Sequence, residues 1–472
     1  MLFNSIEFLF IFLPITFLIY FGLNKLKLVK MATAWLVIAS LTFYSYWKLE
    51  YLPILLISML FNYSVGSTLN SDNKLRINKK LVMIFAVIMN IALLAYFKYF
   101  DFIIENINLI LKQDFNYMHI LLPLAISFFT FQQIAYIVDS YEGKTKEYDF
   151  LTYALFVTFF PQLIAGPIVH HKEMMPQFAK LRNRFINHKN ISIGLFLLAI
   201  GLFKKVMIAD YFSIFARATF DGVAVMTCFE SWCASLSYTF QLYFDFSGYC
   251  DMAMGIGYLF NIVLPQNFNS PYKADSIQDF WRRWHMTLSR FLRDYIYIPM
   301  GGNREGKIRT YINLFTTFLI GGLWHGANWT FVIWGAMHGL AMCIHRLWKT
   351  LNIKIPHFIA VVITFLFANF TWVYFRATSV EIANKVIASM FGLNGFAPIV
   401  VDKLRFSFEN GSLKLSLLLL IPTIILVFFV NNSVEFAKKF RPNWIFFSAT
   451  LIMLTISILS INKVSEFLYF QF

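Results

Sequence analysis

The sequence predicts an all-helical protein that crosses a membrane many times, and three observations support this fold class. Of the 472 residues, 58% are hydrophobic and only 14% are charged, whereas about 25% are charged in a soluble domain. The mean hydropathy is +0.62. A series of apolar runs approaches the roughly 20 residues that cross a bilayer as a helix. These features exclude a soluble multidomain enzyme, a disordered chain and a secreted disulfide-rich scaffold.

The apolar runs follow one another along the whole chain, without a detectable repeat or a long linker. We therefore expect a single membrane domain over residues 1–472. In chain order, the candidate spans lie at 6–23, 31–47, 51–67, 81–99, 118–138, 191–209, 229–249, 311–326, 327–345, 356–375, 412–431 and 444–462.

The distribution of positive charge predicts the orientation of these spans. The formal net charge is +15, and most of the 40 Lys and Arg residues lie in alternate connections. The positive-inside rule places those connections in the cytoplasm and the N-terminus outside. The first span lacks the features of a cleaved signal peptide. Because topology explains the charge, we expect no nucleic-acid partner. The connections are 22–31, 68–80, 139–190, 264–310, 345–355 and 432–442.

One further apolar run, 150–168, contains helix-breaking residues. The alternation of cytoplasmic and outer connections is kept only if this run does not cross the membrane. Pro161, Gly166 and Pro167 interrupt it, and irregular backbone at membrane depth survives where protein or a water-filled cavity covers it. We expect a re-entrant hairpin in which Pro161 and Gln162 line a cavity.

The longest cytoplasmic connection contains a basic amphipathic pattern over 279–295. On a helical wheel the aromatic residues and His285 share one face, while Arg282, Arg283 and three further charged residues share the other. Ser276 and Asp279 have the spacing of a helix cap. One interpretation is an interfacial helix whose arginines meet lipid headgroups. The other is that Arg282 and Arg283 hold an anionic donor, with His285 pointing into the protein.

A second histidine lies in a glycine-rich junction between two apolar helices, in the sequence Gly-Gly-Leu-Trp-His-Gly-Ala-Asn-Trp-Thr at 321–330. A histidine at membrane depth needs a partner or a cavity, and a neutral imidazole suits general-base chemistry. We interpret His325 as a candidate catalytic residue and Trp324 and Asn328 as candidate substrate contacts, although a satisfied core histidine is the plainer alternative.

Asp245 is a further candidate because it interrupts an apolar run. It could orient a histidine, or it could form a structural ion pair with Lys204 or Lys205. His338 and His345, two turns apart, are weaker candidates. The spacings typical of zinc ligands do not occur in the sequence, and we expect no metal.

Several of these motifs occur together in one known family. They are Phe-Pro-Gln-Leu-Ile-Ala-Gly-Pro-Ile (160–168), Gly-Leu-Phe-Lys-Lys (201–205), Tyr-Phe-Asp-Phe-Ser-Gly-Tyr (243–249), Asp-Phe-Trp-Arg-Arg-Trp-His (279–285) and Gly-Leu-Trp-His-Gly-Ala-Asn-Trp-Thr-Phe (322–331). Over residues 90–380 the chain resembles the membrane-bound O-acyltransferases (MBOATs), and above all their bacterial branch that acetylates alginate and peptidoglycan.

The resemblance implies a ring of about 11–13 transmembrane helices with re-entrant and interfacial helices, in a bacterial cytoplasmic membrane. It places His325 at the position of the essential histidine and His285 at that of the second functional histidine. It also implies acetyl-CoA as donor and an extracytoplasmic acetyltransferase partner of the SGNH type.

The leading hypothesis is therefore an O-acetyltransferase that moves an acetyl group across the membrane to a cell-envelope polysaccharide. One alternative keeps the enzyme class but transfers D-alanine to teichoic acid. The other is a transporter or flippase, in which histidines at membrane depth couple to protons.

Overall fold

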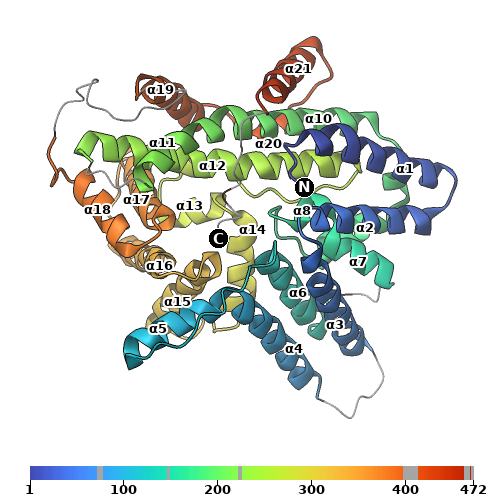
Figure 1. The fold of residues 1–472 in the computed structure, drawn as a ribbon, viewed down its shortest axis with the longest axis horizontal. Coiled ribbons are helices and arrows are strands. Elements are labelled where there is room, and N and C mark those ends of the chain that lie inside the picture. Colours follow the sequence, from blue (N-terminus) through green and yellow to red (C-terminus); the bar gives the residue numbers. More distant parts are fainter. Residues whose placement is uncertain (72–77, 146–148, 222–225, 397–412, 462–467, 469–472) are drawn as a thin grey trace. The chain divides into compact units, whose positions relative to one another are not determined.

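The structure is a computed structural model that describes residues 1–71, 78–145, 149–221, 226–396, 413–461 and 468. All regular secondary structure in these residues is helical, as expected (Figure 1). The chain forms two compact units, which are described separately. Unit 1 comprises Met1–Gly201, Tyr249–Gln266 and Phe440–Asn462, and unit 2 comprises Leu202–Gly248, Asn267–Lys439 and Lys463–Phe472.

Unit 1 contains most of the N-terminal helices, with α1 and α2 forming a hairpin beside α7 and α8 (Figure 1). Its helices are η1 (Phe8–Phe12), α1 (Leu13–Lys25), α2 (Val29–Ser45), η2 (Leu49–Tyr51), α3 (Leu52–Asn70), α4 (Lys79–Leu94), η3 (Ala95–Tyr99), α5 (Phe100–Leu111), α6 (Ile126–Tyr141), α7 (Phe150–Thr158), α8 (Phe160–Leu163), α9 (His171–Ala179), η4 (Leu181–Arg184), most of α10 (His188–Phe203) and α21 (Trp444–Leu459). The boundary between the units falls within α12 (Cys228–Leu259).

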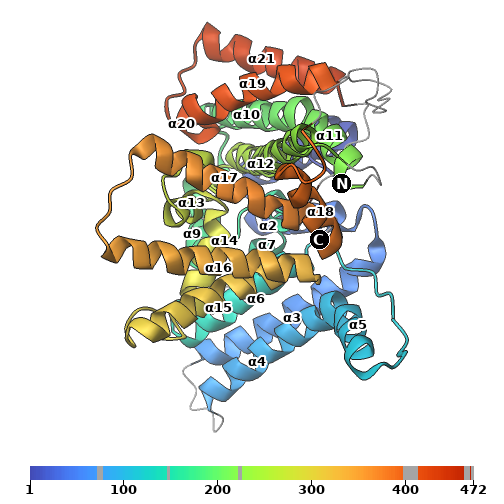
Figure 2. The ribbon, with the colours of Figure 1, turned by 90° about the vertical axis from the view of Figure 1, so that its left-hand side faces the viewer.

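Unit 2 is built around a hairpin of α15 and α16, with α17 packed against α16 (Figure 2). Its helices are η5 (Lys204–Ala209), α11 (Asp210–Phe220), the first part of α12, η6 (Pro271–Lys273), α13 (Ile277–Arg283), α14 (Met286–Leu292), η7 (Arg293–Tyr297), α15 (Lys307–His325), α16 (Trp329–Thr350), α17 (His357–Arg376), α18 (Val380–Met390), α19 (Leu413–Phe429) and α20 (Ser433–Lys438).

Among the residues that the structure describes, five helical stretches are long and apolar enough to cross a bilayer, which agrees with a multi-pass protein. They are Phe8–Lys25, Leu49–Asn70, Lys79–Leu111, His188–Arg217 and His357–Arg376, and three shorter apolar helices are Val29–Ser45, Leu418–Phe429 and Trp444–Leu459.

Three predicted boundaries were wrong. The run at 81–99 continues to Leu111, because a π-helical turn at Ala95–Tyr99 joins α4 to α5 without a break. The run at 118–138 becomes helical only at Ile126, since Pro123 precedes the helix and proline disfavours a helical conformation in the residue before it. The run at 229–249 lies inside a helix that extends to Leu259.

The predicted amphipathic helix over 279–295 was also wrong as one continuous element. The structure has two short helices, α13 and α14, separated at Trp284 and His285, and His285 adopts a left-handed backbone with φ of 42°. The predicted cap is confirmed, because the Ser276 hydroxyl accepts a hydrogen bond from the backbone N–H of Asp279.

Candidate active site

The turn between α15 and α16 places His325 inside unit 2. His325 is the last residue of α15, and α16 begins four residues later. Glycines let the two helices touch along their backbones: a Cβ on Gly322 would lie 2.4 Å from the carbonyl oxygen of Phe331 and 2.9 Å from Cα of Gly335. The glycines of the sequence motif therefore bring the two helices together directly beside the histidine.

Three aromatic rings surround His325, which is only 5% exposed. The ring centroids of Trp324, Trp334 and Phe375 lie 4.9, 5.1 and 5.0 Å from that of His325. The role of Trp324 as a substrate contact stays a prediction, and Trp334 and Phe375 were not singled out from the sequence. The imidazole thus stands in a largely apolar setting, where electrostatic interactions act with less screening than in water.

His285 reaches the interior because a neighbouring loop segment hydrogen-bonds to the helix break. The backbone N–H of Asn269 donates to the carbonyl of Arg283 at 2.9 Å, and the N–H of Met286 donates to the carbonyl of Asn267 at 3.0 Å. These bonds replace helical ones across the break and hold His285 in its left-handed conformation. The His285 side chain is completely buried.

The hydrogen bonds of Asn267 determine the tautomer of His285. The backbone N–H and the hydroxyl of Thr287 both donate to Asn267 Oδ1, at 3.2 and 3.0 Å, so this atom is the amide oxygen. His285 Nδ1 lies 3.2 Å from the same oxygen and therefore donates to it. A neutral imidazole with its proton on Nδ1 carries a lone pair on Nε2.

The Nε2 atom of His285 is buried and has no hydrogen-bond partner among the described residues. Burial also lowers the pKa of His285 to about 3, because a low-dielectric environment disfavours the charged imidazolium. The structure therefore presents a neutral, unprotonated ring nitrogen inside unit 2.

The two histidines lie close together. Their ring centroids are 6.5 Å apart with an interplanar angle of 61°, and Trp324 lies beside both, with its ring centroid 6.1 Å from that of His285. This spacing is too long for a direct hydrogen bond between the rings. It suits two groups that act on one small polar group between them.

The side chain of Asn328 makes hydrogen bonds that stabilise the local structure. Its Oδ1 accepts the backbone N–H of Thr330 at 2.9 Å, which caps α16, and its Nδ2 donates to the carbonyl of Thr378 at 3.0 Å. These bonds account for the side chain without a substrate. Its role as a substrate contact stays a prediction.

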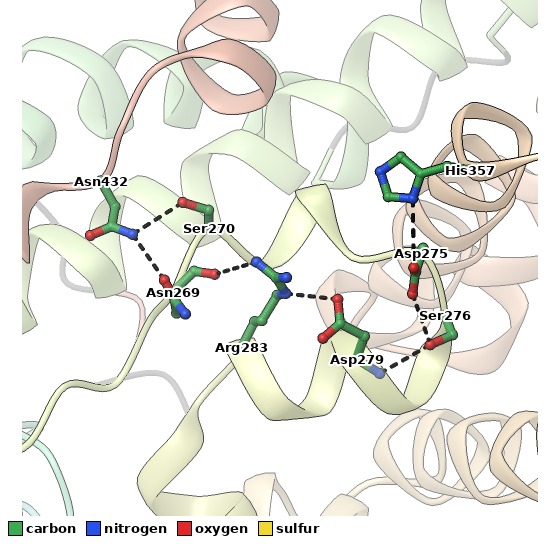
Figure 3. Close-up of polar contacts among 8 residues, drawn as sticks. All are labelled: Asn269, Ser270, Asp275, Ser276, Asp279, Arg283, His357 and Asn432. Atoms are coloured by element: carbon green, nitrogen blue, oxygen red, sulfur yellow. Dashed lines mark hydrogen bonds and ion pairs between the residues drawn. The ribbon is translucent and has the colours of Figure 1, made fainter. Parts of the chain in front are cut away.

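The two arginines predicted to hold the donor differ in their surroundings, and Figure 3 draws the contacts of one of them, Arg283. Arg283 donates to Asp279 at 2.7 Å and to the carbonyl of Asn269 at 3.4 Å, and so links α13 to the loop segment that holds His285. The Asn269 side chain is in turn held by Asn432 at 3.0 Å. Arg282 is exposed.

Asp245 belongs to a buried ion cluster. Lys205 Nζ lies 2.7 Å from Asp245 and 2.8 Å from Asp210, and the backbone N–H of Leu468 donates to the second oxygen of Asp245 at 3.1 Å. Of the two alternatives for Asp245, the structure shows the ion pair with lysine. Lys204 instead donates to the hydroxyl of Ser433 at 3.3 Å.

Pro161 and Gln162 lie in unit 1, in the run predicted as a re-entrant hairpin. The run forms α7 and α8 with a break at Phe159, and both predicted residues are buried. Gln162 Nε2 donates to the carbonyl of Phe156 at 2.7 Å. Within the described residues, Gln162 Oε1 is buried without a hydrogen-bond partner.

Sequence reasoning missed Asn267, whereas His338 was considered only a weaker candidate for the site. His338 accepts the indole N–H of Trp281 at 3.2 Å and lies 3.1 Å from the hydroxyl of Thr371, which makes it a satisfied structural residue joining α13, α16 and α17. A short polar stretch, Gln-Asn-Phe-Asn-Ser at 266–270, precedes the amphipathic pattern and is the only sequence signal for Asn267. In the part of the chain that the structure describes, no group of three or more metal-binding side chains is found.

Comparison with known proteins agrees with this arrangement. The family model of the membrane-bound O-acyltransferases matches residues 140–383. The chain is 47% identical to a peptidoglycan O-acetyltransferase of Helicobacter pylori, across 100% of this chain and 98% of that protein. It is 38% identical to a probable alginate O-acetylase, AlgI, of Pseudomonas aeruginosa, across 89% of this chain and 81% of that one.

A teichoic acid D-alanyltransferase of Bacillus subtilis is more distant, with 29% identity across 53% of this chain and 68% of that protein. The family match covers more than half of the chain, and the two acetyltransferase relatives extend over most of it. The chain belongs to the membrane-bound O-acyltransferase family and is a multi-pass membrane acyltransferase.

Proposed function

We propose that this acyltransferase moves an acetyl group across the bacterial cytoplasmic membrane for O-acetylation of a cell-envelope polysaccharide, with its N-terminus outside. The observation that carries the proposal is the pair of buried histidines, His285 and His325, with centroids 6.5 Å apart. The whole-length similarity to a peptidoglycan O-acetyltransferase supports peptidoglycan as the first acceptor to test, ahead of alginate.

In this proposal the reaction is attack of a hydroxyl on an acetyl thioester. His325 takes the proton of the acceptor hydroxyl, a C–O bond forms to the acetyl carbon, and the C–S bond of the donor breaks. The proton leaves with the thiol. The alternative for His325 is a relay, in which the histidine carries the acetyl group before passing it on.

His285 contributes a hydrogen-bond acceptor for the reacting group. Its Nε2 carries a lone pair because Nδ1 donates to Asn267, and nothing among the described residues occupies that atom. The hydroxyl can therefore donate a hydrogen bond to His285 Nε2 before His325 takes its proton. The aromatic rings around His325 exclude water, which strengthens each of these interactions.

Two parts of the proposal concern molecules that bind the protein. The donor is acetyl-CoA, bound from the cytoplasmic side near His285 and the arginines of 282–293. The acceptor side is served by an extracytoplasmic acetyltransferase of the SGNH type, which receives the acetyl group and sets the choice of polymer. Neither nucleic acid nor a metal ion takes part.

Acetyl transfer by the full-length protein in membrane vesicles tests the proposal. Vesicles loaded with labelled acetyl-CoA and supplied with peptidoglycan fragments and the partner should yield acetylated fragments, and the H325A variant should yield none. The H357A variant is the matched control, because the side chain of His357 is 74% exposed and lies 3.6 Å from Asp275. Wild-type acetylation by a stably folded H325A variant would contradict the proposed role of His325.

The same vesicles separate the two alternative functions. Incorporation of labelled D-alanine instead of acetate would identify alanyl transfer. Movement of a solute across the membrane without any change in acylation would identify a transporter.

A further inference from the structure

A cleft of about 480 Å³ lies at the opposite end of the α15–α16 hairpin from His325. It is bounded by α13, by η7 and the turn after it, and by the facing sides of α15 and α16. We call it the basic cleft because four cationic side chains line it, Arg293, Arg304, Arg346 and Lys349. Gln278 and His345 are among its other polar side chains.

The walls of the basic cleft are held by specific bonds. The turn at Gly301 and Gly302 has φ of 101° and 57°, a left-handed backbone that favours glycine. Asn313 fixes this turn, because its Nδ2 donates to the carbonyls of Met300 and Gly302, both at 3.0 Å. Across the cleft, Lys349 Nζ donates to Gln278 Oε1 at 2.8 Å.

The charges of the cleft are unbalanced. Arg293 pairs with Asp294 at 2.7 Å, but no carboxylate lines the cleft. In the described part of the chain, Arg304 and Arg346 form neither an ion pair nor a side-chain hydrogen bond. Like charges gathered around one cavity repel each other, and an anion that enters relieves the repulsion.

Two helices connect the basic cleft with the histidine pair. Arg293 lies eight residues after His285 along α14 and η7, and Leu314, which lines the cleft, lies eleven residues before His325 along α15. At 1.5 Å per residue these separations are about 12 and about 16 Å. An extended arm of roughly a dozen single bonds covers such a distance.

We propose that the basic cleft binds phosphate groups and anchors the phosphate end of the acyl donor, while the thioester end reaches the histidine pair. The inference rests on the proposed function and changes its residue assignment. The anchoring cations are Arg304, Arg346 and Lys349, with Arg293, in place of Arg282 and Arg283. Guanidinium groups suit this task because their forked N–H groups match phosphate oxygens.

Phosphate esters could also come from the headgroup of an anionic phospholipid. Ile298, Ile344 and Leu347 are exposed next to the cleft, where they could meet acyl chains. The two connecting helices favour the donor as the source, because a headgroup site would need no path to the histidines.

The test uses the full-length protein in nanodiscs and a double variant, R304Q/R346Q, which removes two exposed charges. The matched control is R182Q/R441Q, since Arg182 and Arg441 are also exposed but do not line the cleft. Binding of coenzyme A is measured in phosphatidylcholine nanodiscs, and pantetheine, which has no phosphate, is the comparison ligand. Phosphatidylglycerol bound to the protein is measured separately by native mass spectrometry.

The expected result is coenzyme A binding that is about tenfold weaker in R304Q/R346Q, as for the loss of charge-assisted hydrogen bonds. Binding should be unchanged in the control, and pantetheine should bind both proteins alike. If only the bound phosphatidylglycerol decreases, the cleft binds phosphate but the headgroup is its source, and the donor assignment is overturned.

If R304Q/R346Q retains full binding of both ligands, the phosphate site is overturned, although H325A still tests the proposed function independently. If the wild-type protein catalyses acetyl transfer but binds coenzyme A no better than pantetheine, the assignment of the cleft as a phosphate site is likewise refuted, while the proposed function stands. If the wild type neither binds coenzyme A nor transfers acetyl groups from it, the donor of the proposed function itself is wrong.

Discussion

Asn267 and His285 share a hydrogen bond of 3.2 Å that fixes the protonation pattern of a buried imidazole. The direction of this bond follows from Thr287, whose backbone N–H and hydroxyl both donate to the same oxygen of Asn267. In the proposed mechanism Asn267 is therefore a positioning residue, which acts on the reaction only through His285.

Replacing Asn267 tests this role. The N267A variant should lower kcat about tenfold or more while KM changes little, because His285 can then place its proton on either nitrogen. N267D restores an acceptor for Nδ1 and should recover part of kcat at pH 8.

The pH profile distinguishes positioning from a purely structural effect. Burial keeps the pKa of His285 at about 3 in the native protein, so this group stays unprotonated at neutral pH. A carboxylate in N267D raises that pKa, and activity should then fall between pH 8 and pH 6 more steeply than in the wild type. Equal pH profiles for both proteins would refute the role of Asn267.

The glycine contact between α15 and α16 predicts a strict size limit at position 335. A Cβ on Gly335 would lie 2.6 Å from the carbonyl oxygen of Phe318 and 3.0 Å from Cα of Gly322, so G335A should force the helices apart. We expect a lower Tm and reduced acetyl transfer, with a cost of about 1–3 kcal/mol for overpacking. The control is G22A in α1, where nothing lies within 4 Å and the higher helix propensity of alanine is neutral or stabilising.

The ion cluster around Lys205 predicts different losses of stability for a single variant and for a triple variant. K205M leaves Asp210 and Asp245 without their shared cation and should cost about 3–5 kcal/mol, as for a broken buried pair. The triple variant K205M/D210N/D245N removes the unpaired charges and should recover part of the loss. Thermal unfolding in detergent measures both, and a triple variant less stable than K205M would show that the carboxylates have other partners that matter more.

Asn328 distinguishes a helix cap from a substrate contact. If capping α16 is its role, N328A should cost about 1 kcal/mol of stability with KM nearly unchanged. N328D retains an acceptor for the N–H of Thr330 but loses the donor to the carbonyl of Thr378, so it should recover only part of the stability. A large increase in KM for N328A, at unchanged Tm, would instead support the substrate contact predicted from the sequence.

The sequence was sufficient to predict the helical membrane fold and the location of the glycine-rich turn. The Gly-Gly-Leu-Trp-His-Gly motif at 321–326 marks a tight helix junction, and the structure places His325 at that junction. The pattern of apolar residues alone cannot specify where a helix that looks continuous will break. The wheel over 279–295 is amphipathic throughout, yet Asn267 and Asn269 interrupt it by hydrogen bonding from another segment.

The basic cleft could not be predicted from the sequence, for a similar reason. Arg293, Arg304 and Arg346 come from three separate elements, and only the folding of α15 against α16 brings them around one cavity. Arg282 and Arg283 were more conspicuous because they are adjacent in sequence. Arg283 donates hydrogen bonds to Asp279 and to the carbonyl of Asn269.

The backbone contact between Gly322 and Gly335 limits how the enzyme can open and close. The two helices touch through their main chains at that point and have no side chains there that could rearrange. We therefore expect this hairpin to be a rigid part of the site. In the proposed mechanism, opening or closing of the site would therefore involve the parts that face this hairpin, Phe375 on α17 and the helix break at Trp284 and His285.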